Sequence, residues 1–311
     1  MTDDRSSNGT DEYIEPDPQR HSRVLRGTAA LPSLVTLGNG IAGFAAIHFA
    51  TKPLPPTVIA QGEAAAETWV AHNLVIAAWL LLAGMVCDAV DGQLARMTRR
   101  TSDFGAQLDS LCDAISFGVA PAIIALRTFQ SVLFPIVGEV DVLARTALAG
   151  RVVWFIAALY ACCAILRLAR FNVETDPDPD SHMVFKGLPS PAAATSIIAL
   201  VLLHAHLLKI TEGWLAAEWL PAMVVWAIPV LLLAAALLMV SRLEYPHLVN
   251  QYFRGRRSFG YIVRLTVLVL AVVILDTEFT LAVIILAYVL YTPIRSLVRR
   301  IRLRSKRASK A

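Results

Sequence analysis

Residues 88–113 read DAVDGQLARMTRRTSDFGAQLDSLCD and place four aspartates, in two pairs, at the ends of two strongly apolar runs. A carboxylate inside the hydrocarbon of a membrane costs roughly 2.5–3.5 kcal/mol on insertion scales. Asp88 and Asp91 are three residues apart, and Asp109 and Asp113 are four apart, so each pair shares one face of a helix. The pattern predicts a helix, a short turn and a second helix, with the four carboxylates meeting near one membrane surface.

Clustered carboxylates of this kind favour a metal site. Their oxygens are hard ligands that suit Mg²⁺ or Mn²⁺, and such ions usually hold the phosphates of a substrate. Gly92 and Gly105 lie just inside the two pairs, where they would let a phosphate approach the backbone. Arg96 lies roughly on the face of Asp88, from which its side chain could reach a phosphate. The alternative is that the aspartates are ordinary membrane-edge charges paired with arginine, which explains neither the two pairs nor the glycines.

The pattern D-x2-D-G-x2-A-R-x8-G-x3-D-x3-D resembles the motif of the CDP-alcohol phosphotransferases, and all eight fixed positions match. The resemblance implies a homodimer in which each chain binds two divalent cations, and it makes Asp113 the general base. The metal ligands that it implies are Asp88, Asp91, Asp109 and Asp113. The residues that it implies for the CDP-lipid pocket are Gly92, Ala95, Arg96 and Gly105.

The composition is that of an all-α, polytopic integral membrane protein, since 56% of the 311 residues are hydrophobic and the mean hydropathy is +0.58. A membrane-spanning helix needs about 20 apolar residues. About eight such helices are predicted, and the last two are short enough to form a tight hairpin or a re-entrant pair, of which we favour the hairpin. The predicted spans are Leu31–Ala50, Trp69–Asp91, Ala106–Leu126, Val152–Leu168, Pro191–Leu208, Leu220–Ser241, Tyr261–Leu275 and Phe279–Ile294.

Four regions follow from these spans. Residues 1–22 are polar and are expected to form a disordered cytoplasmic leader. Residues 23–241 would form the CDP-alcohol phosphotransferase-like membrane core, and residues 242–296 a cytoplasmic segment with the C-terminal hairpin. Residues 297–311 would form a basic cytoplasmic tail. No P-loop, Rossmann glycine pattern or nucleic-acid-binding motif is present in the sequence, so nucleic acid is not an expected partner.

The positive charges predict the orientation. With both termini inside, 23 of the 28 Lys and Arg residues fall on the inner side of the eight predicted spans and five on the outer side. Cytoplasmic loops carry an excess of Lys and Arg. Both termini and the aspartates are therefore expected on the cytoplasmic side of the inner membrane.

Two groups of polar residues are candidates for the acceptor pocket. Thr36 and Asn39 lie in the first predicted span, where they could either bond to neighbouring helices or line a substrate pocket. The second group follows the fourth span and contains cationic side chains that suit an anionic acceptor such as the carboxylate of an amino acid. The alternative for its arginines is a role as interfacial anchors. This second group comprises Arg167, Arg170, Asn172 and Lys186.

These segments, together with the run Ser116–Pro121 after Asp113, resemble the phosphatidylserine synthase branch of the family. The branch resemblance implies transfer of the phosphatidyl group of CDP-diacylglycerol to L-serine, giving phosphatidylserine and CMP. Glycerol 3-phosphate, an inositol phosphate or choline remain alternative acceptors, because the cationic group suits phosphorylated acceptors as well. A more distant alternative is an ion-coupled transporter, since membrane carboxylates also mark ion pathways.

Overall fold

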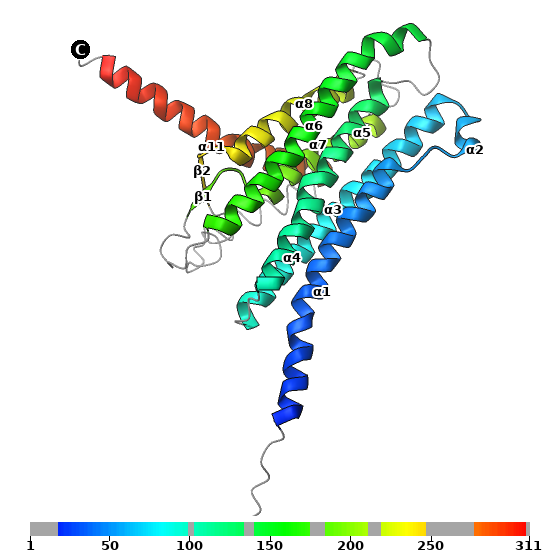
Figure 1. Ribbon diagram of the computed structural model, residues 1–311. Helices are drawn as coiled ribbons and strands as arrows, with labels where there is room; N and C mark the ends of the chain where they lie inside the picture. Colours follow the sequence, from blue (N-terminus) through cyan, green and yellow to red (C-terminus); the bar gives the residue numbers. More distant parts are fainter. Residues whose placement is uncertain are drawn as a thin grey trace, which may run out of the picture.

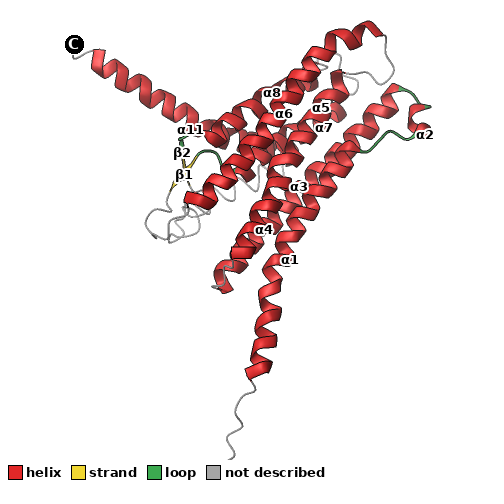
Figure 2. Ribbon diagram, in the orientation of Figure 1, coloured by secondary structure: helices red, strands yellow, loops and turns green. Residues whose placement is uncertain are grey.

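The computed structural model describes residues 18–98, 103–133, 140–174, 184–210, 219–246 and 277–308. Within these ranges the chain is a bundle of helices with one small two-stranded sheet (Figures 1 and 2). The helices and strands, in chain order, are α1 Pro18–Thr51, α2 Pro56–Ile59, α3 Glu63–Thr98, α4 Asp103–Asp113, η1 Ala114–Val119, α5 Ala120–Leu133, α6 Val140–Glu174, β1 Val184–Lys186, α7 Ser190–Ile210, α8 Trp219–Val240, β2 Glu244–Pro246 and α11 Thr277–Ala308.

Among the described residues, six helical segments are long and apolar enough to cross a membrane: Ser33–Thr51, Glu63–Leu94, Phe104–Val132, Leu148–Val173, Ser190–Ile210 and Trp219–Val240. Helices are favoured there because each satisfies its own backbone hydrogen bonds without water. Large apolar side chains also lie on the outside of the bundle, such as Phe44 at 70% exposure and Phe155 at 64%. The expected fold class, an all-α polytopic membrane protein, is therefore confirmed.

These segments overlap the first six predicted spans closely. The seventh predicted span, Tyr261–Leu275, lies outside the described residues, so the hairpin remains a prediction. The eighth falls within α11, whose apolar part, Ala282–Arg295, is shorter than a span. At the other end of the chain, α1 already begins at Pro18, inside the range predicted as leader, and residues 1–17 lie outside the described residues.

The packing of α1 and α7 positions the rest of the bundle. Helix α1 packs most extensively on α3 and also contacts α4, η1 and α5. Figure 1 shows α1 and α3 side by side, with the short α2 connection at one end of the bundle and α4 toward the other. Helix α7, which is largely buried, contacts α3, α5, α8 and α11. The aspartate motif, divided between α3 and α4, therefore lies at the end of the bundle away from α2.

Helix α1 approaches the helix after Asp113 very closely because of a glycine. A methyl group added at Gly43 would lie 2.9 Å from the Cα atom of Ser116, which no real Cβ tolerates without movement of the backbone. Ser116 belongs to η1, one turn of π-helix that begins directly after Asp113 and continues into α5. Single π-turns inside α-helices are frequent at functional sites. Here the π-turn lies at the junction between the aspartate helix and the membrane-spanning helix that follows.

The small sheet lies against α11. Strand β1 pairs antiparallel with β2, and Phe185 lies opposite Tyr245. Gly187 follows β1 with a φ of +87°, a left-handed conformation that glycine adopts at no steric cost. Tyr245 is fully buried, its hydroxyl donates to the carbonyl of Val289 at 3.5 Å, and its ring contacts that of Tyr288. The sheet thus fixes α11 against the core at this end of the bundle.

Candidate metal and phosphotransfer site

Three of the four motif aspartates meet at one point. Asp88 and Asp91 lie on α3 and Asp109 lies on α4, and one carboxylate oxygen from each lies within 4.8 Å of the others. The short connection after Thr98 returns the chain so that α4 places its aspartate opposite the α3 pair, as the spacing predicted. At this separation two ionised carboxylates repel each other by about 3 kcal/mol in an effective dielectric of 20. The cluster therefore requires cations or protons to offset its charge.

The aspartate oxygens fit a bound metal. Asp91 Oδ2 and Asp109 Oδ1 are buried, and neither has a hydrogen-bond partner among the described residues. Buried carboxylate oxygens are normally bonded or coordinate a metal. A set of carboxylate oxygens suits hard divalent cations such as Mg²⁺ and Mn²⁺. The cluster of Asp88, Asp91 and Asp109 can thus hold a divalent metal ion.

Asp113 takes a different position from the other three. It is buried, and its Oδ1 accepts a hydrogen bond of 3.0 Å from the Nδ2 of Asn39 on α1. The backbone carbonyl of Asn39 in turn accepts a 2.8 Å hydrogen bond from the hydroxyl of Ser116. The sequence predicted Asp113 as both base and metal ligand. The structure brings it beside the cluster but not into the group of three whose oxygens converge.

The two polar residues of the first span both face the motif aspartates. Asn39 is fully buried and bonds to Asp113, while the hydroxyl of Thr36 forms a hydrogen bond with Asp91. The sequence left open whether Thr36 and Asn39 bond to neighbouring helices or line the site. In the structure they do both, because the groups to which they bond are carboxylates of the site. The Oδ1 atom of the Asn39 amide is buried and has no hydrogen-bond partner among the described residues.

Arg167, from the second predicted group, is half-buried on α6. One of its guanidinium nitrogens donates to the hydroxyl of Ser190 at 2.8 Å, and its Nε is buried with no partner among the described residues. The guanidinium lies within electrostatic range of Asp113 and of the Tyr288 hydroxyl on α11. A guanidinium with an unused donor beside the predicted base can receive an anionic group.

The remaining predicted residues lie on α3, α4, α6 and β1. Asn172 is exposed and exchanges hydrogen bonds of 2.8 and 3.2 Å with Ser110, which follows Asp109 in α4. Arg170 is half-buried on α6. Gly92 and Gly105 lie half-buried on α3 and α4, beside the aspartates of those helices. The side chains of Ala95, Arg96 and Lys186 lie outside the described part of the chain, so their predicted roles stay predictions.

Sequence reasoning missed three groups at the site. Ser116 follows Asp113 by three residues, so helical spacing alone could have placed it on the same face. Ser190 and Tyr288 come from α7 and α11, far along the chain from the motif, and no local spacing indicates them. Only the tertiary packing of the helices brings these residues near Arg167.

Comparisons with known proteins agree with this geometry. A family described as CDP-alcohol phosphatidyltransferase matches residues 29–240. A relative from Mycobacterium leprae is 29% identical over 275 residues, which are 88% of this chain and 76% of the relative. One from Helicobacter pylori is 35% identical over 177 residues, which are 57% of this chain and 62% of the relative. One from Bacillus subtilis is 30% identical over 170 residues, which are 55% of this chain and 74% of the relative.

All three relatives carry the name CDP-diacylglycerol–serine O-phosphatidyltransferase. The match spans less than two thirds of the H. pylori relative but about three quarters of the other two. The family match covers both aspartate helices, α1 and the following helices up to the end of α8. The chain therefore belongs to the CDP-alcohol phosphatidyltransferase family.

Proposed function

We propose that this protein transfers the phosphatidyl group of CDP-diacylglycerol to the hydroxyl of L-serine, releasing CMP and forming phosphatidylserine. The observation that carries the proposal is the meeting of three carboxylates within 4.8 Å beside a fourth, Asp113, held by an amide. Three converging carboxylates can bind the metal ions that hold a phosphate. A separately positioned carboxylate can remove the proton from an alcohol. The serine acceptor is supported by the names of the relatives.

Asp88, Asp91 and Asp109 would hold the divalent cations, Mg²⁺ or Mn²⁺, and two ions are expected from the family resemblance. Bound there, the cations would neutralise charge on the pyrophosphate and make CMP a better leaving group. The unpartnered oxygens of Asp91 and Asp109 support this assignment. Gly92, Ala95, Arg96 and Gly105 are proposed to shape the pocket for the CDP group.

Asp113 is proposed to remove the proton from the serine hydroxyl. The serine oxygen then forms a bond to the lipid-linked phosphorus, the bond from that phosphorus to the CMP oxygen breaks, and CMP leaves. Asn39 supports this role because its amide fixes one oxygen of Asp113, and the other oxygen is proposed to take the proton. A base must lie within hydrogen-bond reach of its proton, and a positioned carboxylate meets that condition.

Arg167 is proposed to bind the carboxylate of serine. Arginine pairs with carboxylates through two parallel hydrogen bonds, and the Nε of Arg167 is available for one of them. Its position within electrostatic range of Asp113 would place the serine hydroxyl toward the base. Arg170, Asn172 and Lys186 are proposed as weaker contributors to the same pocket or to phosphate binding.

The site is proposed to face the cytoplasm, with both termini on the same side. The distribution of Lys and Arg supports this orientation, and CDP-linked substrates are cytoplasmic. The protein is also proposed to form a homodimer in the inner membrane. Cysteine labelling from either side of sealed vesicles would test the orientation, and cross-linking in the membrane would test the dimer.

The direct test is CMP release from CDP-diacylglycerol by the purified protein in Mg²⁺ or Mn²⁺, with and without serine. We expect release to depend on both the metal and serine, and phosphatidylserine to form in equal amount. Glycerol 3-phosphate, inositol phosphate and choline serve as competing acceptors, and preference for one of them would refute the serine assignment. CMP release that needs no acceptor would instead indicate hydrolysis or a covalent lipid intermediate.

The base assignment is tested by Asp113→Asn. We expect this variant to lose turnover while it still binds CDP-diacylglycerol, because the amide cannot accept the serine proton. Glu63→Gln, at the far end of α3, is the matched control for loss of one carboxylate. Full activity in Asp113→Asn would remove Asp113 from the mechanism.

A further inference from the structure

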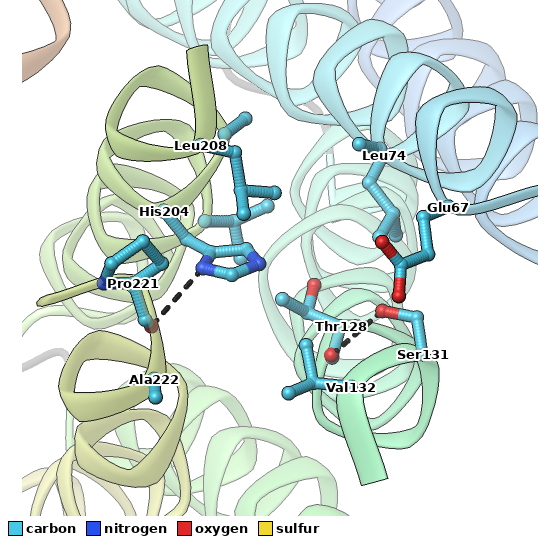
Figure 3. Close-up of a pocket in the computed structure, with 12 residues that line it drawn as sticks. Glu67, Leu74, Thr128, Ser131, Val132, His204, Leu208, Pro221 and Ala222 are labelled. Atoms are coloured by element: carbon cyan, nitrogen blue, oxygen red, sulfur yellow. Dashed lines mark hydrogen bonds between the residues drawn. The ribbon is translucent and has the colours of Figure 1, made fainter. Parts of the chain in front are cut away.

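A cavity with a largely apolar lining and a few polar groups lies at the opposite end of the bundle from the aspartates. It has a volume of about 260 Å³ and lies between α3, α5, α7 and α8 (Figure 3). Glu67 at its edge and Asp88 of the metal cluster are 21 residues apart on α3, or about 31 Å at 1.5 Å per residue. The cavity is therefore separate from the phosphotransfer site, and nothing in the proposed reaction uses it.

Two hydroxyl groups in the cavity wall donate their hydrogens to backbone carbonyl groups. Thr128 Oγ1 donates to the carbonyl of Ile124 at 2.8 Å, and Ser131 Oγ donates to the carbonyl of Thr128 at 2.9 Å. A hydroxyl has one hydrogen and two acceptor lone pairs. Both side chains can therefore offer only lone pairs to a molecule in the cavity.

His204 also presents an acceptor. Its side chain is buried, with 6% exposed, and its Nδ1 lies 3.2 Å from the carbonyl oxygen of Pro221. A carbonyl only accepts, so in the neutral ring the hydrogen is on Nδ1 and Nε2 carries the lone pair. Figure 3 shows this second nitrogen pointing away from Pro221 and into the cavity.

Glu67 completes the set with a carboxylate, which accepts and never donates when ionised. Figure 3 shows Glu67 beside Ser131 and across the cavity from His204. No Lys or Arg is among the described residues that line the cavity. The walls are otherwise largely apolar and include Leu74, Val132, Val201 and Leu208. The cavity therefore combines one negative charge and several acceptors with an apolar lining.

We propose that this cavity binds a primary ammonium group carried on an apolar body, such as an alkylamine or the amine of a lipid. An ammonium group has three donors, no acceptor and one positive charge, so it complements Glu67, the hydroxyl oxygens and His204 Nε2 together. The alkyl part would lie against the apolar walls. A metal ion fits less well, because the only described group of three His, Cys, Asp or Glu side chains with converging ligand atoms is the distant aspartate cluster.

The test uses hexylamine as the probe and hexanol as its uncharged match, added to the purified full-length protein in detergent. Binding is read from the rise in unfolding temperature as a function of ligand concentration. We expect hexylamine to stabilise saturably and at least tenfold more tightly than hexanol. Glu67→Gln should weaken hexylamine binding at least tenfold and leave hexanol binding unchanged. Glu63→Gln, one turn earlier on α3 and outside the cavity lining, should bind hexylamine as the unmodified protein does.

Two further arms separate the sources of the amine. In nanodiscs, phosphatidylethanolamine in place of phosphatidylcholine should raise the apparent Kd for hexylamine if the lipid amine occupies the cavity. An unchanged Kd would identify the free amine as the ligand. Equal binding of hexylamine and hexanol, or unaltered hexylamine binding by Glu67→Gln, would overturn the proposal. The proposal would also be overturned if micromolar Zn²⁺ stabilised the protein in a way that depends on Glu67 while hexylamine had no effect. CMP release by Glu67→Gln should stay within twofold of the unmodified value, which separates this result from failure of the proposed function.

Discussion

Replacement of Asn39 by alanine isolates the contribution of α1 to the proposed chemistry. In the structure the Asn39 amide donates to Asp113 at 3.0 Å in a fully buried position. Asn39→Ala removes this donor and leaves Asp113, the metal cluster and the backbone carbonyl of residue 39 in place. If Asn39 holds the base in position, turnover should fall while binding of CDP-diacylglycerol stays nearly constant.

The size of the loss follows from the hydrogen bond. A hydrogen bond to a charged group contributes about 1.5–3 kcal/mol net, and 1.36 kcal/mol corresponds to a factor of ten in rate. We therefore expect kcat to fall roughly 10- to 150-fold. Asn39→Asp should be more damaging, because it places a further carboxylate against Asp113 in addition to removing the donor.

The assay is CMP release at saturating CDP-diacylglycerol with serine varied, after a thermal-unfolding check that each variant is folded. Ser116→Ala is the matched control, because it removes the hydrogen bond to the backbone carbonyl of Asn39 and leaves the amide in place. This control should lose about 1 kcal/mol of stability and little turnover. A kcat for Asn39→Ala within twofold of the unmodified value would refute a positioning role for the amide.

Three further predictions concern the metal cluster, the acceptor and the helix contact. Asp109→Asn should raise the Mg²⁺ concentration needed for half-maximal CMP release, whereas a change in maximal rate alone would contradict a ligand role. Arg167→Lys should raise the KM for serine about tenfold, because lysine cannot form the paired hydrogen bonds, with the KM for CDP-diacylglycerol as the internal control. Gly43→Ala should destabilise the protein by about 1–3 kcal/mol, since its new methyl would meet the Cα of Ser116 at 2.9 Å; an unchanged unfolding temperature would show that α1 and η1 can separate freely.

The sequence predicted the parts of the site that depend on local spacing. Residues three and four apart share a helix face whatever surrounds them, so both aspartate pairs could be assigned to two helices. The apolar runs predicted eight spans, and the first six coincide with long apolar helices of the described residues, because hydrocarbon leaves few alternatives to a helix. A short turn was predicted between the two pairs, and the structure places Asp109 of α4 against Asp88 and Asp91 of α3.

The contacts between distant helices could not be predicted in the same way. Asn39 and Asp113 are 74 residues apart, and Arg167 and Ser190 belong to different helices. Each polar residue of a span has several neighbouring helices to which it could bond, and one sequence does not choose among them. The π-turn after Asp113 gives no composition signal either, and yet it determines where Ser116 points.

The neutral groups of α1 bear on how the site works. The aspartate helices supply charge, but Asp113 differs from the other three chiefly by its bond to the amide of Asn39. That bond requires α1 to lie close to η1, and Gly43 permits the approach while Ser116 bonds to the Asn39 carbonyl. A carboxylate that an amide holds away from the converging oxygens can remove the proton of the acceptor. The other three carboxylates then remain available to bind the cations. We therefore propose that α1, which lies outside the aspartate motif, sets the position of Asp113 relative to the three converging carboxylates, and that Asn39→Ala should impair proton removal more than metal binding.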